Sequence, residues 1–235
     1  MLPALFPTFA DPGRWLPLLR HHADLVAEAA PRVKVTTVPA DELVRRQYAE
    51  SLELLRLMRE AADFDRVADV GSGGGWPGLV IAAVDPGLRV DLIEPRKKRA
   101  TLLLSMAEAL GLANVHVHAV RAEEAGRGDL RDAASAVTAR AVAPLPTLLE
   151  YVAPLVRPGG LVALPRGSSA ASDVDAAAPS ARILGLTFDG LRPMRPAVSH
   201  TAIVALYTKV APTPERYPRR PGIPEKRPLE CRQGD

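Results

Sequence analysis

The segment at residues 67–84, VADVGSGGGWPGLVIAAV, places a glycine-rich stretch with one tryptophan between two apolar runs. Glycine has no Cβ, so it lets a ligand approach the backbone closely and tolerates positive φ. The first run predicts a strand that includes Asp69, and the second predicts a helix that begins near Pro77, where a missing N–H costs nothing. This layout indicates a ligand bound beyond the carboxyl end of a strand.

Two classes of cofactor fit these glycines. Gly73, Gly75 and Gly78 satisfy the G-x-G-x-x-G pattern of dinucleotide sites, and Glu94 ends the next predicted strand, where a carboxylate can bind ribose hydroxyls. The adenosine ribose of S-adenosylmethionine needs a carboxylate at the same place. The local spacing therefore leaves an NAD-dependent oxidoreductase and a methyltransferase both open.

The surrounding sequence predicts an α/β protein with a mostly parallel sheet. Apolar residues recur at helical spacing in 14–30 and 41–62, so we expect residues 1–62 to form an N-terminal helical extension. Val-rich strands then alternate with helical segments, the pattern of βαβ units. We expect these strands at 66–70, 89–94, 114–120, 135–141 and 161–165, and the helices between them include 97–112 and 144–156.

The last third of the sequence contains two adjacent strand patterns and then a tail rich in proline and arginine. Residues 181–190 and 200–210 both have strand patterns with no room for a helix between them, which predicts an antiparallel pair at one edge of the sheet. We expect the main domain to span residues 63–210. Residues 211–235 are rich in proline and arginine, and we expect this tail to lie extended over the surface.

Composition favours a cytoplasmic protein. The 30 Lys and Arg residues exceed the 27 Asp and Glu by three, which permits a nucleic-acid partner without requiring one. Cys231 is the single cysteine, which excludes a disulfide framework and a cysteine-based metal site. The histidines lack metal-ligand spacing, and no apolar run reaches the roughly 18 residues of a membrane span. We expect a monomer with no metal and no membrane partner.

Five ordered motifs carry a family resemblance. They are DVGSGGGWPGLVIA, LIEPRKKRATLL, AVRAEE, TARAVAPLPTLLEYVAPLVRPGG and RYPRRPGIPEKRPL. Together they resemble the RsmG family, also called GidB, which methylates N7 of a guanine in bacterial small-subunit (16S) ribosomal RNA. The resemblance implies a class I methyltransferase fold with seven strands, the last of them antiparallel. It also implies S-adenosylmethionine as the methyl donor and ribosomal RNA or the small ribosomal subunit as the partner.

The resemblance also assigns residues to the donor site. Gly71 and Trp76 match positions that contact the donor, as the glycine loop with Gly73 and Gly75 does, and Glu94 matches the acid at the second strand tip. Ala122 and Glu123 match a pair near the adenine, and Arg140 matches an arginine of the same site. Guanine N7 has a free lone pair and needs no deprotonation, so we assign no catalytic base.

The sequence departs from the family pattern in places. Gln47 stands where histidine is expected, Glu50 where aspartate is expected, and Arg166 takes the place of a lysine. The altered N-terminal helices keep a third possibility open, an RNA-binding relative without catalytic activity.

Two clusters of basic residues are candidates for contact with RNA phosphates. We expect the cluster at 96–99 to be mainly solvated, and we expect the tail cations Arg216, Arg219, Arg220, Lys226 and Arg227 to contact RNA.

Overall fold

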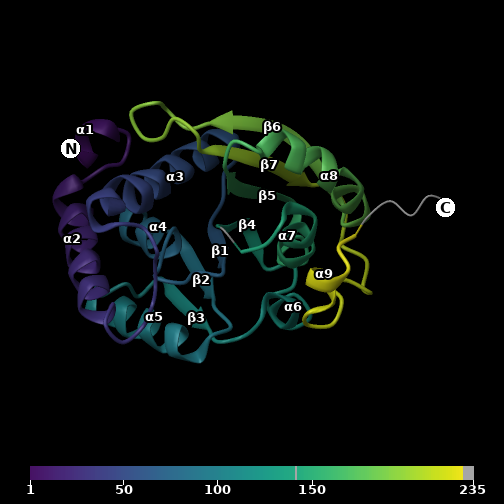
Figure 1. The fold of residues 1–235 in the computed structure, drawn as a ribbon, viewed down its shortest axis with the longest axis horizontal. Helices are drawn as coiled ribbons and strands as arrows, with labels where there is room; N and C mark the ends of the chain where they lie inside the picture. The colour runs from purple at the N-terminus through teal and green to yellow at the C-terminus, as the bar shows by residue number, and fades with distance from the viewer. Residues whose placement is uncertain (141, 230–235) are drawn as a thin grey trace.

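A seven-stranded sheet forms the centre of the computed structural model, which describes residues 1–140 and 142–229 (Figure 1). Its strands are ordered β3-β2-β1-β4-β5-β7-β6. The bounds are β1 (Arg66–Val70), β2 (Arg89–Ile93), β3 (Val115–His118), β4 (Ala134–Ala139), β5 (Val156–Arg166), β6 (Leu186–Pro193) and β7 (Ile203–Lys209). The first five strands are parallel, and β7 runs antiparallel between β5 and β6. The predicted α/β class and the antiparallel last strand are confirmed.

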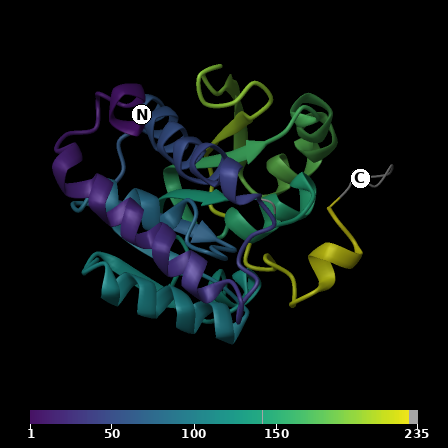
Figure 2. The ribbon, with the colours of Figure 1, turned by 60° about the vertical axis from the view of Figure 1, so that its left-hand side comes forward.

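Helices cover both faces of the sheet. One face carries α3 (Glu50–Ala61), α4 (Gly78–Val84) and α5 (Lys97–Ala109), and α2 (Pro12–Ala29) packs outside α4 and α5 (Figure 2). The other face carries α6 (Ala122–Ala125), α7 (Leu145–Val152) and α8 (Ala170–Ile183). The shorter elements are α1 (Leu2–Leu5), η1 (Ala40–Glu42), the π-helical turn η2 (Val44–Ala49) and α9 (Ile223–Lys226).

The strand sequences explain this layered arrangement. Successive side chains of a strand point to opposite faces of a sheet. In β1, Val67 joins the apolar cluster beneath α3 and α4, whereas Ala68 joins the cluster beneath α7 and α8. Because helices cover both faces at the centre of the sheet, every residue of β4 is buried, whereas most residues of the edge strand β6 are exposed.

Helix α8 is a correction to the sequence analysis. We expected a strand at 181–190, but α8 extends to Ile183 and β6 begins only at Leu186. Pro179 lies inside α8, and an internal proline argues against a helix when the sequence alone is read. The helix nevertheless buries Ala170, Val174, Ala177 and Ala181, which follow one another at the helical period.

The tail is anchored rather than simply extended. Its Arg219 side chain binds the fully buried carboxylate of Glu150 on α7, with Nη2 2.6 Å from Oε2. Arg131 donates to the carbonyls of Thr213 and Tyr217, and α9 lies against α7. The chain end with Cys231 lies outside the described residues. In the described part of the chain, no helix is long and apolar enough to cross a membrane.

The strand order fixes where a ligand can bind. Strand β1 lies between β2 and β4: the chain runs from β1 to β2 and β3 on one side, and the connection from β3 to β4 then crosses to the other side. In open α/β sheets, ligands bind beyond the carboxyl ends of the strands at such a point. The glycine-rich segment follows the carboxyl end of β1 and therefore lies there.

Candidate functional site

The glycine loop between β1 and α4 is held by its own backbone and by Asp69. The N–H of Gly71 donates to the carbonyl of Ile93, 2.8 Å away, and the Ser72 hydroxyl donates to the Asp69 carbonyl. The Asp69 carboxylate accepts from the N–H of Gly78 at 3.0 Å, the first residue of α4. Burial raises the pKa of Asp69 to about 6, an effect partly offset by this bond from Gly78.

Three of the predicted glycines have positive φ for different reasons. Gly71 has φ +75°, and a Cβ there would lie 2.6 Å from Val142 Cγ2. Gly73 has φ +56° with ordinary space around it, so only its backbone conformation favours glycine. Gly75 has φ +98°, and its Cβ would lie 2.5 Å from Leu79 Cδ1, which makes it a packing position.

Trp76 is buried beneath the loop. Its ring packs edge-on against His22 and Tyr48, with ring centroids 5.2 and 5.8 Å away. His22 in turn lies between the Tyr48 hydroxyl, 3.0 Å from Nδ1, and the Gly74 carbonyl, 2.9 Å from Nε2. A carbonyl only accepts, so Nε2 carries the proton and Nδ1 accepts from the hydroxyl. The neutral imidazole therefore links α2 to the glycine loop.

The buried His22 predicts loss of stability in mild acid. Burial lowers its pKa to about 4 from the ordinary 6.5, so below pH 6.5 the unfolded chain binds a proton that the folded chain does not. The free energy of unfolding is then unaffected by this group above pH 6.5 and falls by about 3 kcal/mol between pH 6.5 and 4. Chemical denaturation across this range measures the effect.

The control for this prediction is His22→Gln, whose amide can still donate to Gly74. Asp69 titrates in the same range with the opposite sign, because its folded-state pKa is raised. The difference between the two proteins therefore isolates His22. Equal pH slopes in both proteins would contradict the assignment.

A first cavity of about 640 Å³ opens at the tips of β1, β2 and the segment after β3. We call it the Glu94 cavity. Glu94 is 3% exposed, and its two carboxylate oxygens accept from the N–H groups of Gly73 at 3.1 Å and Arg96 at 2.9 Å. Each oxygen keeps a lone pair, so the carboxylate can also accept from a ligand. The cavity is further lined by Gly71, Ile93, Ala122, Glu123, Arg140, Val142 and Tyr151.

The tail closes one side of the Glu94 cavity. The buried Glu123 carboxylate accepts from the N–H of Gly222 at 3.0 Å, and Glu225 of α9 lines the cavity. Glu123 therefore ties the tail to α6. Because Oε1 already accepts from Gly222, a ligand would contact the backbone of Glu123 instead of this oxygen. The sequence offered no signal for Glu225 or for Tyr151.

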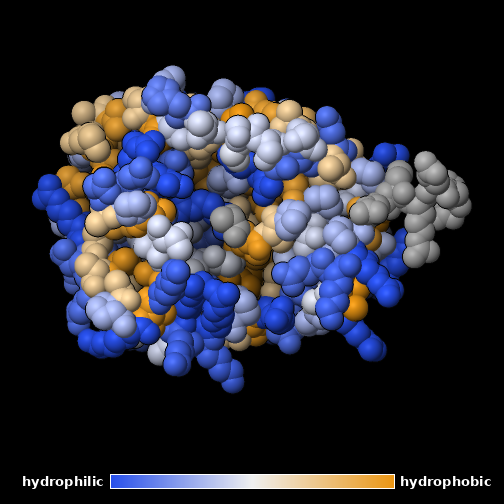
Figure 3. Space-filling view, in the orientation of Figure 1, coloured by the Kyte–Doolittle hydropathy of each residue, from blue (hydrophilic) through white to orange (hydrophobic). Residues whose placement is uncertain are grey.

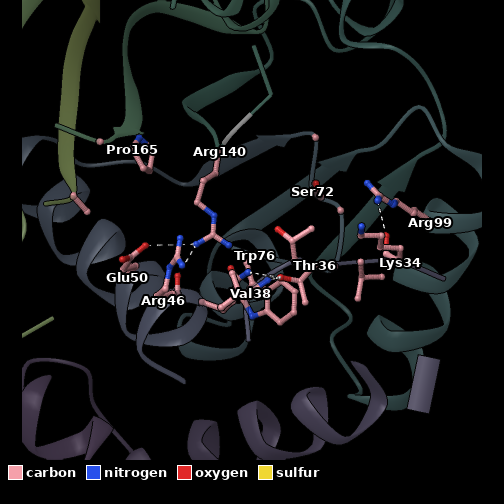
Figure 4. A pocket seen from close by; sticks show the side chains of 18 of the residues that line it. Lys34, Thr36, Val38, Arg46, Glu50, Ser72, Trp76, Arg99, Arg140 and Pro165 are labelled. Atoms are coloured by element: carbon pink, nitrogen blue, oxygen red, sulfur yellow. Dashed lines mark hydrogen bonds and ion pairs between the residues drawn. The ribbon is translucent and has the colours of Figure 1, made fainter. Parts of the chain in front are cut away.

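A second cavity of about 550 Å³ lies on the other side of Gly71, and we call it the Glu50 cavity. Figure 4 shows its wall, which the loop at 34–38 and the start of α3 build together with the glycine loop. Trp76 and Gly73 line this cavity and not the Glu94 cavity, and Gly75 lines neither. Gly71, Arg99 and Arg140 line both, so the two cavities meet at these residues.

Arg140 is the predicted residue that joins the two cavities. It follows β4, and its Nη1 donates to the Arg46 carbonyl at 3.0 Å and lies 3.9 Å from Glu50 Oε2 (Figure 4). Burial lowers its pKa, and the nearby Glu50 and Asp69 carboxylates oppose that change. The guanidinium stays charged, so it can bind an electron-rich group of a ligand in either cavity.

The structure also places residues that sequence analysis did not connect to the site. The departures Gln47, Glu50 and Arg166 all line the Glu50 cavity. Of the basic cluster at 96–99, Arg96, Lys97 and Arg99 line the Glu94 cavity, so this cluster borders the site instead of only meeting solvent. In the orientation of Figure 3, both hydrophilic and hydrophobic residues border a hollow near the middle of the face.

The tail cations divide into two groups. Arg219 forms an ion pair with Glu150, and Arg216 stacks on Tyr217, with its Cζ 5.2 Å from the ring centroid. Arg220, Lys226 and Arg227 are exposed. Among the described residues, no three His, Cys, Asp or Glu side chains lie together as a candidate metal site.

Comparison with known proteins identifies similar sequences. Residues 16–188 match the family described as GidB: rRNA small subunit methyltransferase G. The ribosomal RNA small subunit methyltransferase G of Sorangium cellulosum is 40% identical over 76% of this chain and 73% of its own length. The protein of the same name from Roseiflexus castenholzii is 39% identical over 84% of this chain and 85% of its own.

Solved structures share the fold at low identity. A mutant of MtNAS in complex with S-adenosylmethionine aligns with a TM-score of 0.54 at 17% identity, over 84% of this chain and 77% of that one. A SAM-dependent O-methyltransferase from Thermotoga maritima aligns with a TM-score of 0.53 at 22% identity, over 80% of this chain and 71% of that one. These likenesses concern the architecture of the sheet and its helices.

Proposed function

Because the chain belongs to the family of rRNA small subunit methyltransferase G, we propose that it methylates N7 of a guanine in small-subunit ribosomal RNA. The chain is an S-adenosylmethionine-dependent rRNA methyltransferase with the class I fold. The single observation that supports the finer assignment is the meeting of two cavities at Gly71, Arg99 and Arg140. One ligand in each cavity would bring its reacting atom to that shared wall.

The Glu94 cavity suits the donor. Gly71 lies where any Cβ would contact Val142, so the bare backbone keeps the passage between the cavities open. The Glu94 carboxylate faces the place where ribose hydroxyls would donate, and the backbone at 122–123 with Ile93 would flank the adenine. When bound, S-adenosylmethionine supplies a methyl group on a positively charged sulfur.

The Glu50 cavity suits the acceptor base. Guanine N7 attacks with its own lone pair, so the protein need not remove a proton. The chain's contribution is then to hold N7 in line with the methyl carbon at near-attack distance and to exclude water. A base buried here must leave its stack, which costs a few kcal/mol that its contacts in the cavity must offset.

Cations around the site fit an RNA substrate. Arg96, Lys97 and Lys98 are exposed beside the Glu94 cavity, and Arg45 and Arg46 are exposed beside the Glu50 cavity. Phosphate contacts from such residues supply much of RNA affinity and weaken with salt. We propose that both cavities of one chain suffice, so that the protein acts as a monomer on ribosomal RNA in the cytoplasm.

Mapping the methylated base tests the proposed function. The protein is incubated with labelled S-adenosylmethionine and with small ribosomal subunits or their naked RNA, and the modified nucleotide is then located. We expect 7-methylguanine at one position. If neither form of the RNA acquires it, the assignment of N7 fails. Calorimetric titration with NAD checks the dinucleotide alternative, which the relatives do not support, and we expect no heat of binding.

A further inference from the structure

Glu50 is an unusual residue for a cavity that receives RNA. It is the first residue of α3, and its side chain is 18% exposed. Among the described residues that line the Glu50 cavity, it has the only carboxylate. The other charged residues of this wall are Lys34, Arg46, Arg99, Arg140 and Arg166. Cations suit a polyanionic substrate, so the single carboxylate must serve a different purpose from theirs.

Besides its ion pair with Arg140, the carboxylate of Glu50 can bind a substrate that donates hydrogen bonds to it. An ionised carboxylate accepts and cannot donate. Burial raises the pKa of Glu50, while the charge of Arg140 favours the ionised form. A hydrogen bond with Ser199 favours that form as well, and the lone pairs that remain on the carboxylate can accept from a ligand. RNA phosphates and ribose ring oxygens only accept. Ribose 2′-hydroxyls and the amino groups of adenine and cytosine can donate singly, whereas guanine presents two donor groups, N1–H and the N2 amino group, side by side on its Watson–Crick edge.

The position of Glu50 relative to Arg140 matches that edge. Arg140 lines both cavities, whereas Glu50 lines only the Glu50 cavity, and their side chains converge with Nη1 and Oε2 3.9 Å apart (Figure 4). Guanine has O6 beside N1–H, with N7 on the opposite side of O6. A base whose N7 faces the shared wall therefore brings O6 towards Arg140 and its Watson–Crick edge towards Glu50.

A second acceptor lies in the same wall. Gln47 is 5% exposed, and its Oε1 has no hydrogen-bond partner in the described part of the chain, while its Nε2 donates to Thr36 Oγ1 at 3.0 Å. Buried polar atoms normally have a partner. An unpaired acceptor beside Glu50 is a second, independent indication of a ligand that donates.

On the basis of the proposed function, we propose that Glu50 determines specificity for guanine by accepting from N1–H and the N2 amino group, with Arg140 donating to O6. The protein then presents one donor, from Arg140, followed by two acceptor oxygens, from Glu50. Cytosine presents its donor and two acceptors to guanine in the same order. Adenine reverses this order, because its N6 amino group would face Arg140 and its N1 lone pair would face Glu50. A site with such paired groups rejects the wrong base strongly, since its buried groups are left without partners.

Substitution of Glu50 combined with a change of the base tests this assignment. The substrate RNA carries guanosine or inosine, which lacks the N2 amino group, at the position mapped for the wild-type protein. We expect the wild type to prefer guanosine in kcat/KM by about 10-fold. We expect Glu50→Gln to lower kcat/KM on guanosine by about 10- to 100-fold and to bring the ratio of guanosine to inosine close to one.

A matched variant and a binding measurement isolate the contact between Glu50 and the base. Glu60→Gln makes the same change at an exposed position of α3 and should behave as wild type. Calorimetric affinity for S-adenosylmethionine should be unchanged in Glu50→Gln, which shows that the donor side is intact. A wild type with no preference for guanosine over inosine, or a Glu50→Gln protein that keeps the preference, would overturn the inference. A wild type that forms no 7-methylguanine would instead overturn the proposed function.

Discussion

Replacing Gly71 with aspartate is expected to abolish methyl transfer and to weaken S-adenosylmethionine binding by on the order of 100-fold. Gly71 has φ +75°, and its Cβ would lie 2.6 Å from Val142 Cγ2. The new side chain would therefore enter the wall shared by the Glu94 and Glu50 cavities. Calorimetric titration measures donor affinity, and the transfer assay with ribosomal RNA measures the activity.

Gly111→Asp is the control for this substitution. Gly111 also has positive φ, +65°, but a Cβ there has no atom within 4 Å, and the residue lies after α5 outside both cavities. Both substitutions place aspartate in a left-handed conformation, which costs about 1–2 kcal/mol. Only Gly71→Asp should lose donor affinity. Equal donor affinities in the two variants would show that the passage at Gly71 does not limit binding.

Replacing Arg219 with alanine is expected to lower the free energy of unfolding by about 3–5 kcal/mol. The Glu150 carboxylate is fully buried on α7, and Arg219 donates to it from Nε, Nη2 and the backbone N–H at 2.6–3.1 Å. Without the guanidinium, a buried charge keeps only the backbone donor. Chemical denaturation of the full chain measures the loss.

The neighbouring Arg220→Ala is the matched control, because Arg220 is exposed and bears the same charge. Its free energy of unfolding should stay within about 0.5 kcal/mol of wild type. A similar, small effect in both variants would mean that the pair with Glu150 does not anchor the tail. The tail also carries Gly222 and Glu225 to the Glu94 cavity, so Arg219→Ala should weaken donor binding as well.

Much of the fold follows from local sequence patterns. Strand β1 occupies the predicted residues 66–70, and α5 and α7 lie within the predicted segments 97–112 and 144–156. Strand β1 is a nearly continuous apolar run because both faces of the sheet are covered, whereas a helix that packs on the sheet buries mainly one side. Helix α8 was not predicted, because its buried positions are mostly alanines, which give a weak apolar signal, and their burial depends on packing against α7 and the sheet.

The residues proposed to bind the donor were more predictable than those proposed to bind the acceptor base. The residues Gly71, Glu94, Ala122 and Glu123 follow strand ends, where the chain order itself indicates proximity. The loop at 34–38 has no comparable motif, and it reaches the site only through packing of α2 and α3 on the sheet. Trp76 lines the Glu50 cavity because its ring turns beneath the loop towards His22, a direction that spacing cannot reveal.

The shared wall of Gly71, Arg99 and Arg140 has a thermodynamic consequence. Any rearrangement of Arg140 that one ligand induces changes the free energy with which the other ligand binds. The four binding steps form a closed cycle, so the factor by which RNA alters donor affinity equals the factor by which the donor alters RNA affinity. The same reciprocity applies to the demethylated donor and the methylated RNA. Each product is therefore expected to change the equilibrium affinity for the other by one and the same factor, whichever of the two dissociates first.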